Sequence, residues 1–375
     1  MTTSTLSVDY YFGAQKGPNQ IQKWFSCWHR LLQGEIDSRF ISVRQKYVPE
    51  RSAGVLVNLY LQSLIVVLRR RAGAILHIPS QLLCGISAPF WSHVGPNVIT
   101  CHDAIPYLSE NLQLTGGSYS RMIIQHQRHA LQKAEAILVD SEYTRKDLVE
   151  KTDLKLSPQC IHLVYLGVDA QHYAPRPRDV RMMARYNFAT DRANLLYVGS
   201  EAPRKNLEGI VKAMDILRNQ GIPTRLVKIG ARELRGARFH ELIHTLELDD
   251  DIIQYENVPE TDLPYLYNAA DVFVFPSFYE GFGMPVLEAM ASGCPVVTST
   301  MTSLPELAEG AAVLVAPQDA EAIADGIKQI LTSAPLQQEL VRQGLERVRQ
   351  FSWKKTAQST LQIYQGLAGH SRSGD

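Results

Sequence analysis

The chain has 375 residues, of which 45% are hydrophobic and 20% charged, and its 38 basic residues balance its 38 acidic ones. This composition predicts a globular protein of two domains or one large one, and excludes a disordered or fibrous chain. The zero net charge argues against a bulk nucleic-acid binder, so no nucleic-acid partner is expected. Five cysteines without a CxxC pair, and a start that lacks a signal-peptide pattern, favour a cytoplasmic protein with free thiols.

In the first half of the chain, short apolar runs predict strands, and the longer periodic stretches between them predict helices. The expected strands are residues 40–43, 74–78, 97–101, 136–139 and 161–164. The expected helices are residues 20–32, 53–69, 120–133 and 144–151. This alternation is typical of a parallel sheet that is covered by helices.

The most apolar stretch, residues 53–68, is followed directly by Arg69, Arg70 and Arg71. It is too short and too often interrupted by polar residues to span a bilayer. Two interpretations stay open: a buried helix of an α/β domain, or a helix on an anionic membrane surface with its arginines on lipid phosphates. Residues 51–100 contain four arginines and no acid, so peripheral contact with the inner face of a membrane is one expectation.

Residues 173–179 are rich in proline and arginine, lack an apolar period and are interpreted as a linker. The alternation then restarts, with expected strands at 195–198, 225–229, 272–275, 295–298 and 312–315. The expected helices of this half are residues 207–219, 234–248, 286–292, 320–331 and 337–350. We therefore expect an α/β protein with one domain over residues 1–175 and a second over 176–352.

Two segments of the second half follow strands, at the place where doubly wound sheets hold their ligands. The first, residues 197–207, carries Arg204 and Lys205 where a helix is expected to begin. The helix dipole is already positive there, so two cations cost stability unless an anion binds. Taken alone, this segment fits either a phosphate site or a solvated basic pair.

The second segment, residues 275–293, has glycines in a loop and Pro285 at the expected start of a helix. Gly281 and Gly283 allow a ligand to approach the backbone. The amides expected to point at an anion are those of Met284, Val286 and Leu287.

Two acids accompany this phosphate-like loop. Glu280 lies in the loop and Glu288 follows one turn into the expected helix. A carboxylate is unfavourable beside phosphate but suits sugar hydroxyls, which donate hydrogen bonds. The structural alternative is a capped helix that carries surface acids.

Residues 199–206, 265–271, 275–299 and 304–306 together resemble the signature of the retaining glycosyltransferases of family 4, in which two glutamates form an E-x7-E pattern. The resemblance implies the GT-B fold: two Rossmann-like, doubly wound domains facing a cleft, with a C-terminal helix at about residues 353–370 that crosses back to the first domain. It also implies that the first domain binds the acceptor and the second binds a sugar nucleotide. Residues 101–106 and 141–145 resemble family segments of the first domain.

The resemblance implies roles for individual residues. Arg204 and Lys205 would neutralise the diphosphate of the donor, Glu280 would bind hydroxyls of the transferred sugar, and Glu288 would bind the ribose. His102 would reach over the sugar from the first domain. The other expected donor contacts are Gly199, Ser200, Val258, Phe282, Gly283, Met284, Pro285, Val286 and Leu287. The first loop on the acceptor side would include Gly13, Lys16 and Gly17.

Three positions depart from the usual family pattern. Ser200 stands where many members have arginine, and Arg204 is expected to substitute for it. The glycines of the first loop are split, and Thr302-Ser303 replaces a Gly-Gly pair. We expect these changes to affect acceptor contacts more than donor chemistry.

The expected function is that of a retaining hexosyltransferase without a cofactor. No metal is expected, because no Asp-x-Asp pair ends a strand. Residues 102–106 and 303–306 favour GDP-mannose over a UDP-sugar as donor, and the acceptor would be a glycan or lipid-linked sugar of polysaccharide assembly. Two alternatives stay open: another GT-B sugar-nucleotide enzyme, such as an epimerase or hydrolase, and a non-catalytic sugar-nucleotide-binding protein.

Overall fold

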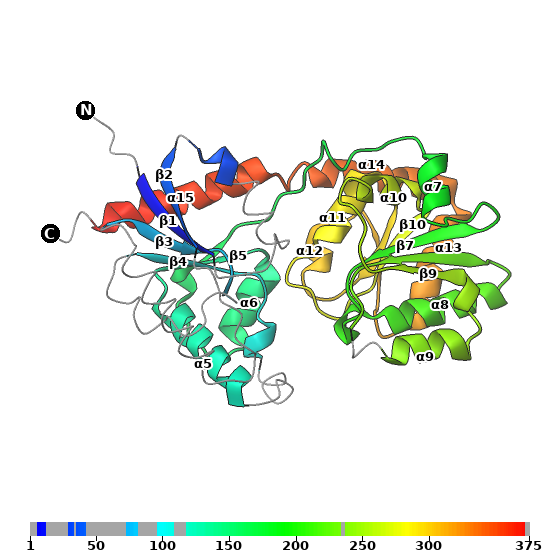
Figure 1. Cartoon of the computed structure of the whole chain (residues 1–375), viewed down its shortest axis with the longest axis horizontal. Coiled ribbons are helices and arrows are strands. Elements are labelled where there is room, and N and C mark those ends of the chain that lie inside the picture. Colours follow the sequence, from blue (N-terminus) through cyan, green and yellow to red (C-terminus); the bar gives the residue numbers. More distant parts are fainter. Residues whose placement is uncertain are drawn as a thin grey trace. The chain divides into compact units, whose positions relative to one another are not determined.

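The computed structural model describes residues 6–12, 29–33, 35–42, 73–81, 96–108, 118–233 and 237–371. The chain forms two compact units: unit 1 comprises Met1–Gly167 and Trp353–Asp375, and unit 2 comprises Val168–Ser352 (Figure 1). The first loop with Gly13, Lys16 and Gly17 lies outside the described residues, as do residues 53–71 and most of the expected helix at 20–32.

Unit 1 is built on a parallel sheet of six strands in the order β2-β1-β3-β4-β5-β6. The strands are β1 (Leu6–Phe12), β2 (Ile36–Ser42), β3 (Ile75–Ile78), β4 (Asn97–Cys101), β5 (Ala136–Val139) and β6 (Ile161–Leu163). β1 is absent from the strands expected from sequence because Asp9 interrupts its apolar run. Asp9 is nevertheless fully buried in the sheet.

Successive residues of these strands point to opposite faces of the sheet, as the pleat requires. Leu76 and Ile78 pack on one face, whereas Ile75, which directly precedes Leu76, packs on the other. The first face is covered by α5 (Ser118–Lys133) and α6 (Glu142–Glu150), with the 3-10 turns η2 (Ile105–Tyr107) and η3 (Pro158–Cys160) beside them. The buried faces explain why β3 and β5 are buried along their whole length and lack an alternation of apolar and polar residues.

The opposite face of this sheet is covered by the C-terminal helix α15 (Trp353–Ser371), which returns to unit 1 as expected (Figure 1). Its Tyr364 is fully buried, and the Tyr364 hydroxyl lies 2.5 Å from His77 Nδ1. The second ring nitrogen of His77 lies 2.9 Å from the Thr100 hydroxyl. Burial lowers the pKa of His77 to about 3, so this ring is neutral under the helix.

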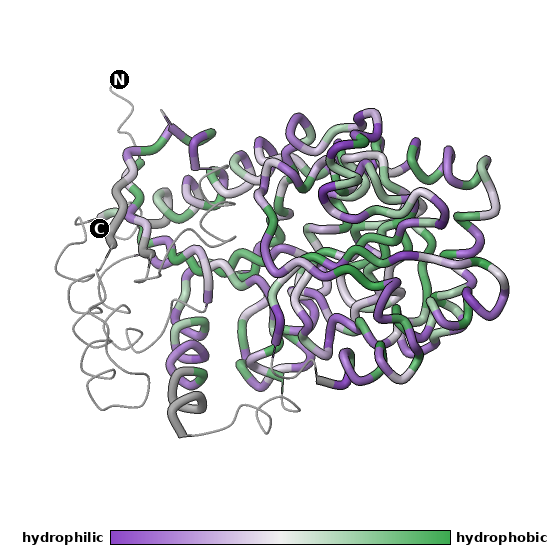
Figure 2. The backbone as a smooth tube through the Cα atoms, turned by 45° about the vertical axis from the view of Figure 1, so that its right-hand side comes forward, coloured by the Kyte–Doolittle hydropathy of each residue, from purple (hydrophilic) through white to green (hydrophobic). Residues whose placement is uncertain are grey.

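Unit 2 holds a second parallel sheet of six strands, in the order β12-β11-β10-β7-β8-β9. The strands are β7 (Ala193–Val198), β8 (Thr224–Ile229), β9 (Ile252–Tyr255), β10 (Val272–Phe275), β11 (Val296–Ser299) and β12 (Val313–Val315). Figure 2 shows hydrophobic segments running through the interior of this unit. β9 was not expected from sequence, because it is a short edge strand that is only partly buried.

Helices cover both faces of this second sheet (Figure 1). On one face, α8 (Leu207–Asn219) packs against α9 (Ala237–Thr245) and α13 (Ala320–Thr332). The other face carries α10 (Leu263–Ala269), α11 (Met284–Ala291), α12 (Leu304–Ala308) and α14 (Ala334–Val348). Three short helices, α10, α12 and α7 (Val180–Arg185), were not expected because they span fewer than two full turns.

The segment expected to be a linker packs against unit 2. Tyr173 is buried, and the Arg176 amide donates to Asn268 Oδ1 at 2.6 Å. Arg178 forms an ion pair with Asp271 at 2.6 Å. The segment expected to be a linker thus belongs to unit 2, and its polar residues have partners that lie far away in the sequence.

The strand order of unit 2 reverses at β7. The chain runs from β7 to β8 and β9 on one side, and then returns to β10, β11 and β12 on the other. The loops that follow β7 and β10 therefore leave neighbouring strands in opposite directions. Ligands of doubly wound sheets bind at such a point, beyond the carboxyl ends of the strands.

Candidate functional site

Asn206 joins the loops at this point of unit 2. Its φ of +58° turns the chain, and its Oδ1 accepts a hydrogen bond from the Gly209 amide, capping α8. Its Nδ2 donates to the carbonyl oxygens of Pro276 at 3.0 Å and Pro317 at 2.5 Å. One side chain thus connects the loops after β7, β10 and β12. Sequence analysis gave it no role, because both carbonyl partners are distant in the chain.

The two cations lie just before α8, which begins at Leu207 as the sequence predicted. Arg204 and Lys205 lie in the 3-10 turn η4 (Pro203–Lys205), and α8 begins only after Asn206. The Arg204 carbonyl accepts a hydrogen bond from the Phe278 amide at 2.8 Å, which fixes the turn to the loop after β10. The cations therefore face that loop from a rigid turn rather than from the end of the helix.

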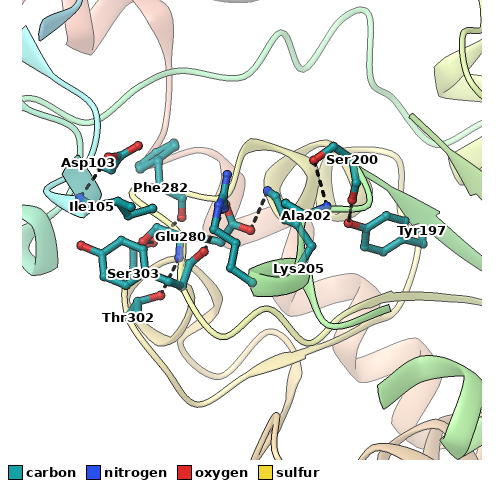
Figure 3. A network of polar contacts seen from close by, with 12 residues as sticks. Asp103, Ile105, Tyr197, Ser200, Ala202, Lys205, Glu280, Phe282, Thr302 and Ser303 are labelled. Atoms are coloured by element: carbon teal, nitrogen blue, oxygen red, sulfur yellow. Dashed lines mark hydrogen bonds and ion pairs between the residues drawn. The ribbon is translucent and has the colours of Figure 1, made fainter. Parts of the chain in front are cut away.

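Arg204, Lys205 and Glu280 form one charged cluster. Figure 3 shows Lys205 and Glu280 facing each other. Lys205 Nζ lies 2.6 Å from Glu280 Oε1, and Arg204 lies 3.4 Å from Glu280 Oε2. The Lys205 and Glu280 side chains are only 13% and 9% exposed, whereas Arg204 is 40% exposed. Two cations against one carboxylate leave an excess positive charge, which suits an anionic ligand.

The backbone around Glu280 is held by side chains of the loop after β11. The Glu280 amide donates to the Thr302 hydroxyl at 3.1 Å. The Ser303 hydroxyl lies 3.0 Å from the Glu280 carbonyl oxygen and 2.7 Å from that of Phe282. The Thr302-Ser303 pair therefore contacts the Glu280 loop, which is the expected donor side.

Gly283 is required by the geometry of the loop before α11. Its φ is +114°, and a Cβ atom there would lie 2.7 Å from a methyl group of Leu304. Met284 and Pro285 begin the helix, with Gly283 in the N-cap position. The Val286 amide donates to the Gly283 carbonyl oxygen at 3.0 Å, so the expectation that it points freely at an anion was wrong.

The remaining residues expected along the donor lie near the same edge of the sheet or within α11. A Cβ on Gly199 would lie 2.6 Å from the Tyr197 hydroxyl, which donates to the Ser200 carbonyl oxygen at 2.9 Å. Val258 is partly buried in the loop that follows β9. The side chains that are buried, leaving only backbone for a ligand, are those of Phe282, Met284, Val286 and Leu287.

Glu288 belongs to a second cluster, with two tyrosines. The Tyr267 hydroxyl donates to Glu288 Oε2 at 2.8 Å, and Tyr173 also hydrogen-bonds the carboxyl group. Burial raises the pKa of Glu288 to about 7, although the tyrosine hydrogen bonds oppose this shift. Sequence analysis missed both tyrosines. Tyr267 lies in an apolar segment that suggested only core packing, and Tyr173 begins the segment that was interpreted as a linker.

A third charged network lies beneath the loop after β7. Lys228, fully buried in β8, donates to Glu201 Oε1 and to the Gly230 carbonyl oxygen, both at 2.7 Å. His240 lies 3.1 Å from Glu201 Oε2. Burial raises the pKa of Glu201, but the hydrogen bonds from Lys228 and His240 outweigh it and the net shift is downward. A lysine in the middle of an apolar strand was the available sequence signal.

His102 lies in unit 1, after β4, with both ring nitrogens engaged. Nδ1 lies 2.5 Å from Asp140 Oδ2, and Nε2 lies 3.0 Å from the carbonyl oxygen of Pro79. Because both partners are acceptors, both nitrogens carry protons and the ring is an imidazolium. Burial lowers the pKa of His102, but Asp140 and the Pro79 carbonyl raise it by more, so the net shift is upward. In this structure the ring joins three loops of unit 1, and its expected role above the sugar stays a prediction.

The described part of the chain offers neither a metal-binding cluster nor a membrane-spanning helix. No group of three or more His, Cys, Asp or Glu side chains in that part is arranged to hold a metal ion. Nor does any described helix combine the length and apolar character needed to cross a membrane.

Two family models match consecutive parts of the chain. Residues 181–347 match the model of glycosyl transferases group 1, and residues 25–172 match that of glycosyltransferase family 4. The chain is 33% identical over 243 residues to O-antigen chain mannosyltransferase B of Escherichia coli, covering 64% of this chain and 62% of the relative. It is 29% identical over 251 residues to MMP alpha-(1->4)-mannosyltransferase of Mycolicibacterium hassiacum, covering 64% and 56%. The chain thus matches less than two thirds of the length of these relatives.

Solved structures support the fold. Sucrose-phosphate synthase from Thermosynechococcus elongatus superposes with a TM-score of 0.75 at 21% identity, covering 97% of this chain and all of that one. Anabaena Alr3699/HepE in complex with UDP and glucose gives a TM-score of 0.74 at 17% identity, covering 97% of this chain and 100% of that chain. The two matched models together with this fold show that the chain belongs to the glycosyltransferases with the GT-B fold.

Proposed function

We propose that this chain is a retaining glycosyltransferase that moves a hexose from a nucleotide-diphosphate sugar to a glycan or lipid-linked acceptor. The observation that carries the proposal is the cluster of Glu280, Lys205 and Arg204 where the strand order of unit 2 reverses. A carboxylate beside two cations suits a ligand that carries both hydroxyl groups and phosphates. Unit 2 would then bind the donor and unit 1 the acceptor.

Lys205 and Arg204 would stabilise the leaving diphosphate as its charge grows. Without a ligand, Lys205 is paired with Glu280 at 2.6 Å. A bound sugar nucleotide would give each partner a new contact, with phosphate oxygens on the ammonium and sugar hydroxyls on the carboxylate. Fixed cations in a partly dry site lower the barrier because they need no rearrangement when the bond breaks.

Mannose is the favoured sugar, with GDP-mannose as donor. Two relatives carry the name mannosyltransferase, which supports this choice. A UDP-sugar is the other option. Alr3699/HepE, which shares this fold, has been solved in complex with UDP and with UDP-glucose, which supports a nucleotide sugar as donor. Glu288 would then hold the ribose, and backbone groups at Val258 the base.

The proposed route is retaining and needs neither metal nor cofactor. The departing phosphate would accept the proton of the acceptor hydroxyl on the same face of the sugar, without a covalent nucleophile on the protein. Arg204 and Lys205 supply the positive charge that a metal would otherwise provide. Turnover that is unchanged by EDTA supports this part of the proposal, and turnover that is lost with EDTA and restored by a divalent cation contradicts it.

Peripheral membrane contact is a separate proposal, and it rests on the sequence of residues 53–71 alone. Flotation with anionic vesicles at low and high salt tests it. Binding that salt weakens is expected for arginines on lipid phosphates. A chain that never floats with the vesicles contradicts the contact and a place at the inner face of a membrane.

Ligand-observed NMR with GDP-mannose, UDP-glucose, UDP-galactose, UDP-N-acetylglucosamine and the free nucleotides tests the donor site. One donor should bind best, and Lys205→Ala should weaken it. Binding with release of free nucleotide but no transfer would point to a hydrolase or epimerase. Binding without any turnover would point to a non-catalytic binding protein, and no binding at all would overturn the proposal.

A further inference from the structure

Two hydroxyl side chains from the loop after β11 bracket the backbone of Glu280 (Figure 3). The Thr302 hydroxyl accepts from the Glu280 amide, 3.1 Å away. The Ser303 hydroxyl is placed to donate to the carbonyl oxygens of Glu280 and Phe282, at 3.0 and 2.7 Å. The backbone N–H and C=O groups of Glu280 are therefore both hydrogen-bonded, the first to Thr302 and the second to Ser303.

Thr302 adopts a backbone conformation that a β-branched residue rarely takes. Its φ is +60°, in the left-handed region where its Cβ is crowded and glycine is not. The shape of this turn alone would therefore be better served by glycine. What the threonine adds at this position is the hydroxyl group that meets the Glu280 amide.

Ser303 connects this turn to the floor beneath the Glu280 loop. It is fully buried and directly precedes α12, whose Leu304 packs against Gly283. The loop after β11 and the loop after β10 thus form one packed layer. The Glu280 side chain extends from this layer, and its Oε1 lies 2.6 Å from Lys205 Nζ. The position of the carboxylate therefore depends on the two hydroxyls that hold the Glu280 backbone.

We propose that Thr302 and Ser303 are positioning residues of the donor-sugar site, which hold the Glu280 carboxylate where the hydroxyls of the transferred sugar meet it. The inference rests on the proposed function. It predicts that the two hydroxyls matter for a nucleotide sugar but not for the nucleotide alone, because the nucleotide has no sugar for Glu280 to contact.

Three substitutions of Thr302 separate its hydroxyl from its backbone effect. Thr302→Ser keeps the hydroxyl, Thr302→Val removes it but keeps the branched shape, and Thr302→Gly removes it and relieves the strained φ. We expect kcat/KM with GDP-mannose to fall about tenfold in Thr302→Val and Thr302→Gly, and less than about threefold in Thr302→Ser. GDP binding should stay within about twofold of wild type, and Tm of the Gly variant should not fall.

Ser303→Ala is tested against Ser299→Ala as its matched control. Ser299 is also fully buried, and its hydroxyl accepts from the Met301 amide in the same turn, at 3.0 Å. No described contact joins its side chain to Glu280. We expect Ser303→Ala to lower kcat/KM for GDP-mannose about tenfold while Ser299→Ala stays near wild type.

Kinetics with GDP-mannose and calorimetric titration with GDP give separable outcomes. Wild-type kcat/KM in Thr302→Val and Thr302→Gly would overturn the inference. An equal loss of GDP and GDP-mannose binding would overturn it too, because it indicates a structural role. If the wild-type chain uses no nucleotide sugar, the proposed function fails first and the inference falls with it. Wild-type turnover with unaffected variants overturns the inference alone.

Discussion

Lys205→Ala separates what Lys205 contributes to folding from what it contributes to catalysis. In the structure, its ammonium lies 2.6 Å from Glu280, and the two side chains are only 13% and 9% exposed. Removing the ammonium leaves a nearly buried carboxylate. Its remaining cation is Arg204, which is 3.4 Å away and 40% exposed. The substitution should therefore lower both stability and turnover, for different reasons.

The loss of stability is set by the carboxylate that is left behind. Breaking a fully buried ion pair from one side costs about 3–5 kcal/mol. Since Arg204 stays near Glu280 and is itself 40% exposed, we expect a loss of about 2 kcal/mol, or about 4–8 °C in Tm for a unit of this size. The loss of a fixed cation facing the diphosphate should lower kcat/KM about 100- to 1000-fold.

The double variant Lys205→Ala/Glu280→Gln is the matched control. Its neutral amide removes the unpaired charge, so its Tm should return to within about 2 °C of wild type. Its turnover should stay low, because the cation is still missing. Scanning calorimetry measures Tm, and steady-state transfer from GDP-mannose measures kcat/KM.

Two results would refute this reasoning. A Lys205→Ala chain with kcat/KM within about threefold of wild type would show that the ammonium does not stabilise the transition state. A double variant that regains turnover along with Tm would show that Lys205 acts only through folding.

Further predictions concern the residues that shape the site. Asn206→Ala removes a helix cap and two buried hydrogen-bond donors, and should cost about 3 kcal/mol in urea unfolding; a loss under about 0.5 kcal/mol contradicts it. Because the pKa of Glu288 is raised from 4.5 to about 7, wild-type stability should fall by up to about 3 kcal/mol as pH rises from about 4.5 to 7, whereas Glu288→Gln removes this dependence; parallel pH profiles of Tm contradict it. The raised pKa of His102 stabilises unit 1 below pH 6.5, and this contribution is lost as pH rises through the folded pKa. Asp140→Asn should therefore lower Tm more at about pH 6 than at pH 9, and an equal effect at both would contradict this.

The fold was largely predictable because its elements follow local patterns. Short apolar runs located β4, β5 and β10 at the bounds observed, and proline and glycine located α11 to within about two residues. The missed elements lacked such signals. β1 contains a buried acid, and β9 is an edge strand of only four residues that is mostly half-buried.

The candidate site was predictable only where its residues are close in sequence. Arg204 and Lys205 are adjacent, and Glu280 lies in a recognisable loop, so the sequence indicated them as partners of one ligand. Their geometry depends on contacts between distant loops, which no local pattern reveals. Asn206 reaches a carbonyl oxygen 111 positions away, and Thr302 reaches an amide 22 positions away.

The turn before α8 shows the same limit in another way. The sequence predicted α8 at its observed bounds, but it did not reveal that Arg204 and Lys205 lie in a separate 3-10 turn, which the left-handed Asn206 divides from the helix. The amide of Val286 was expected to be free, but the first turn of α11 closes on Gly283. Residue types indicated the chemistry of these loops, whereas hydrogen bonding inside the loops decided which groups face the ligand.

The central claim is transfer of a hexose with retention at the cluster of Glu280, Lys205 and Arg204. Proton NMR of the anomeric signals tests it most directly, with GDP-α-D-mannose and a mannose-terminated oligosaccharide as substrates. We expect the donor signal to decline while a new α-glycosidic signal grows, with neither change in Lys205→Ala. A donor that stays intact, or a product with a β linkage, would contradict the account.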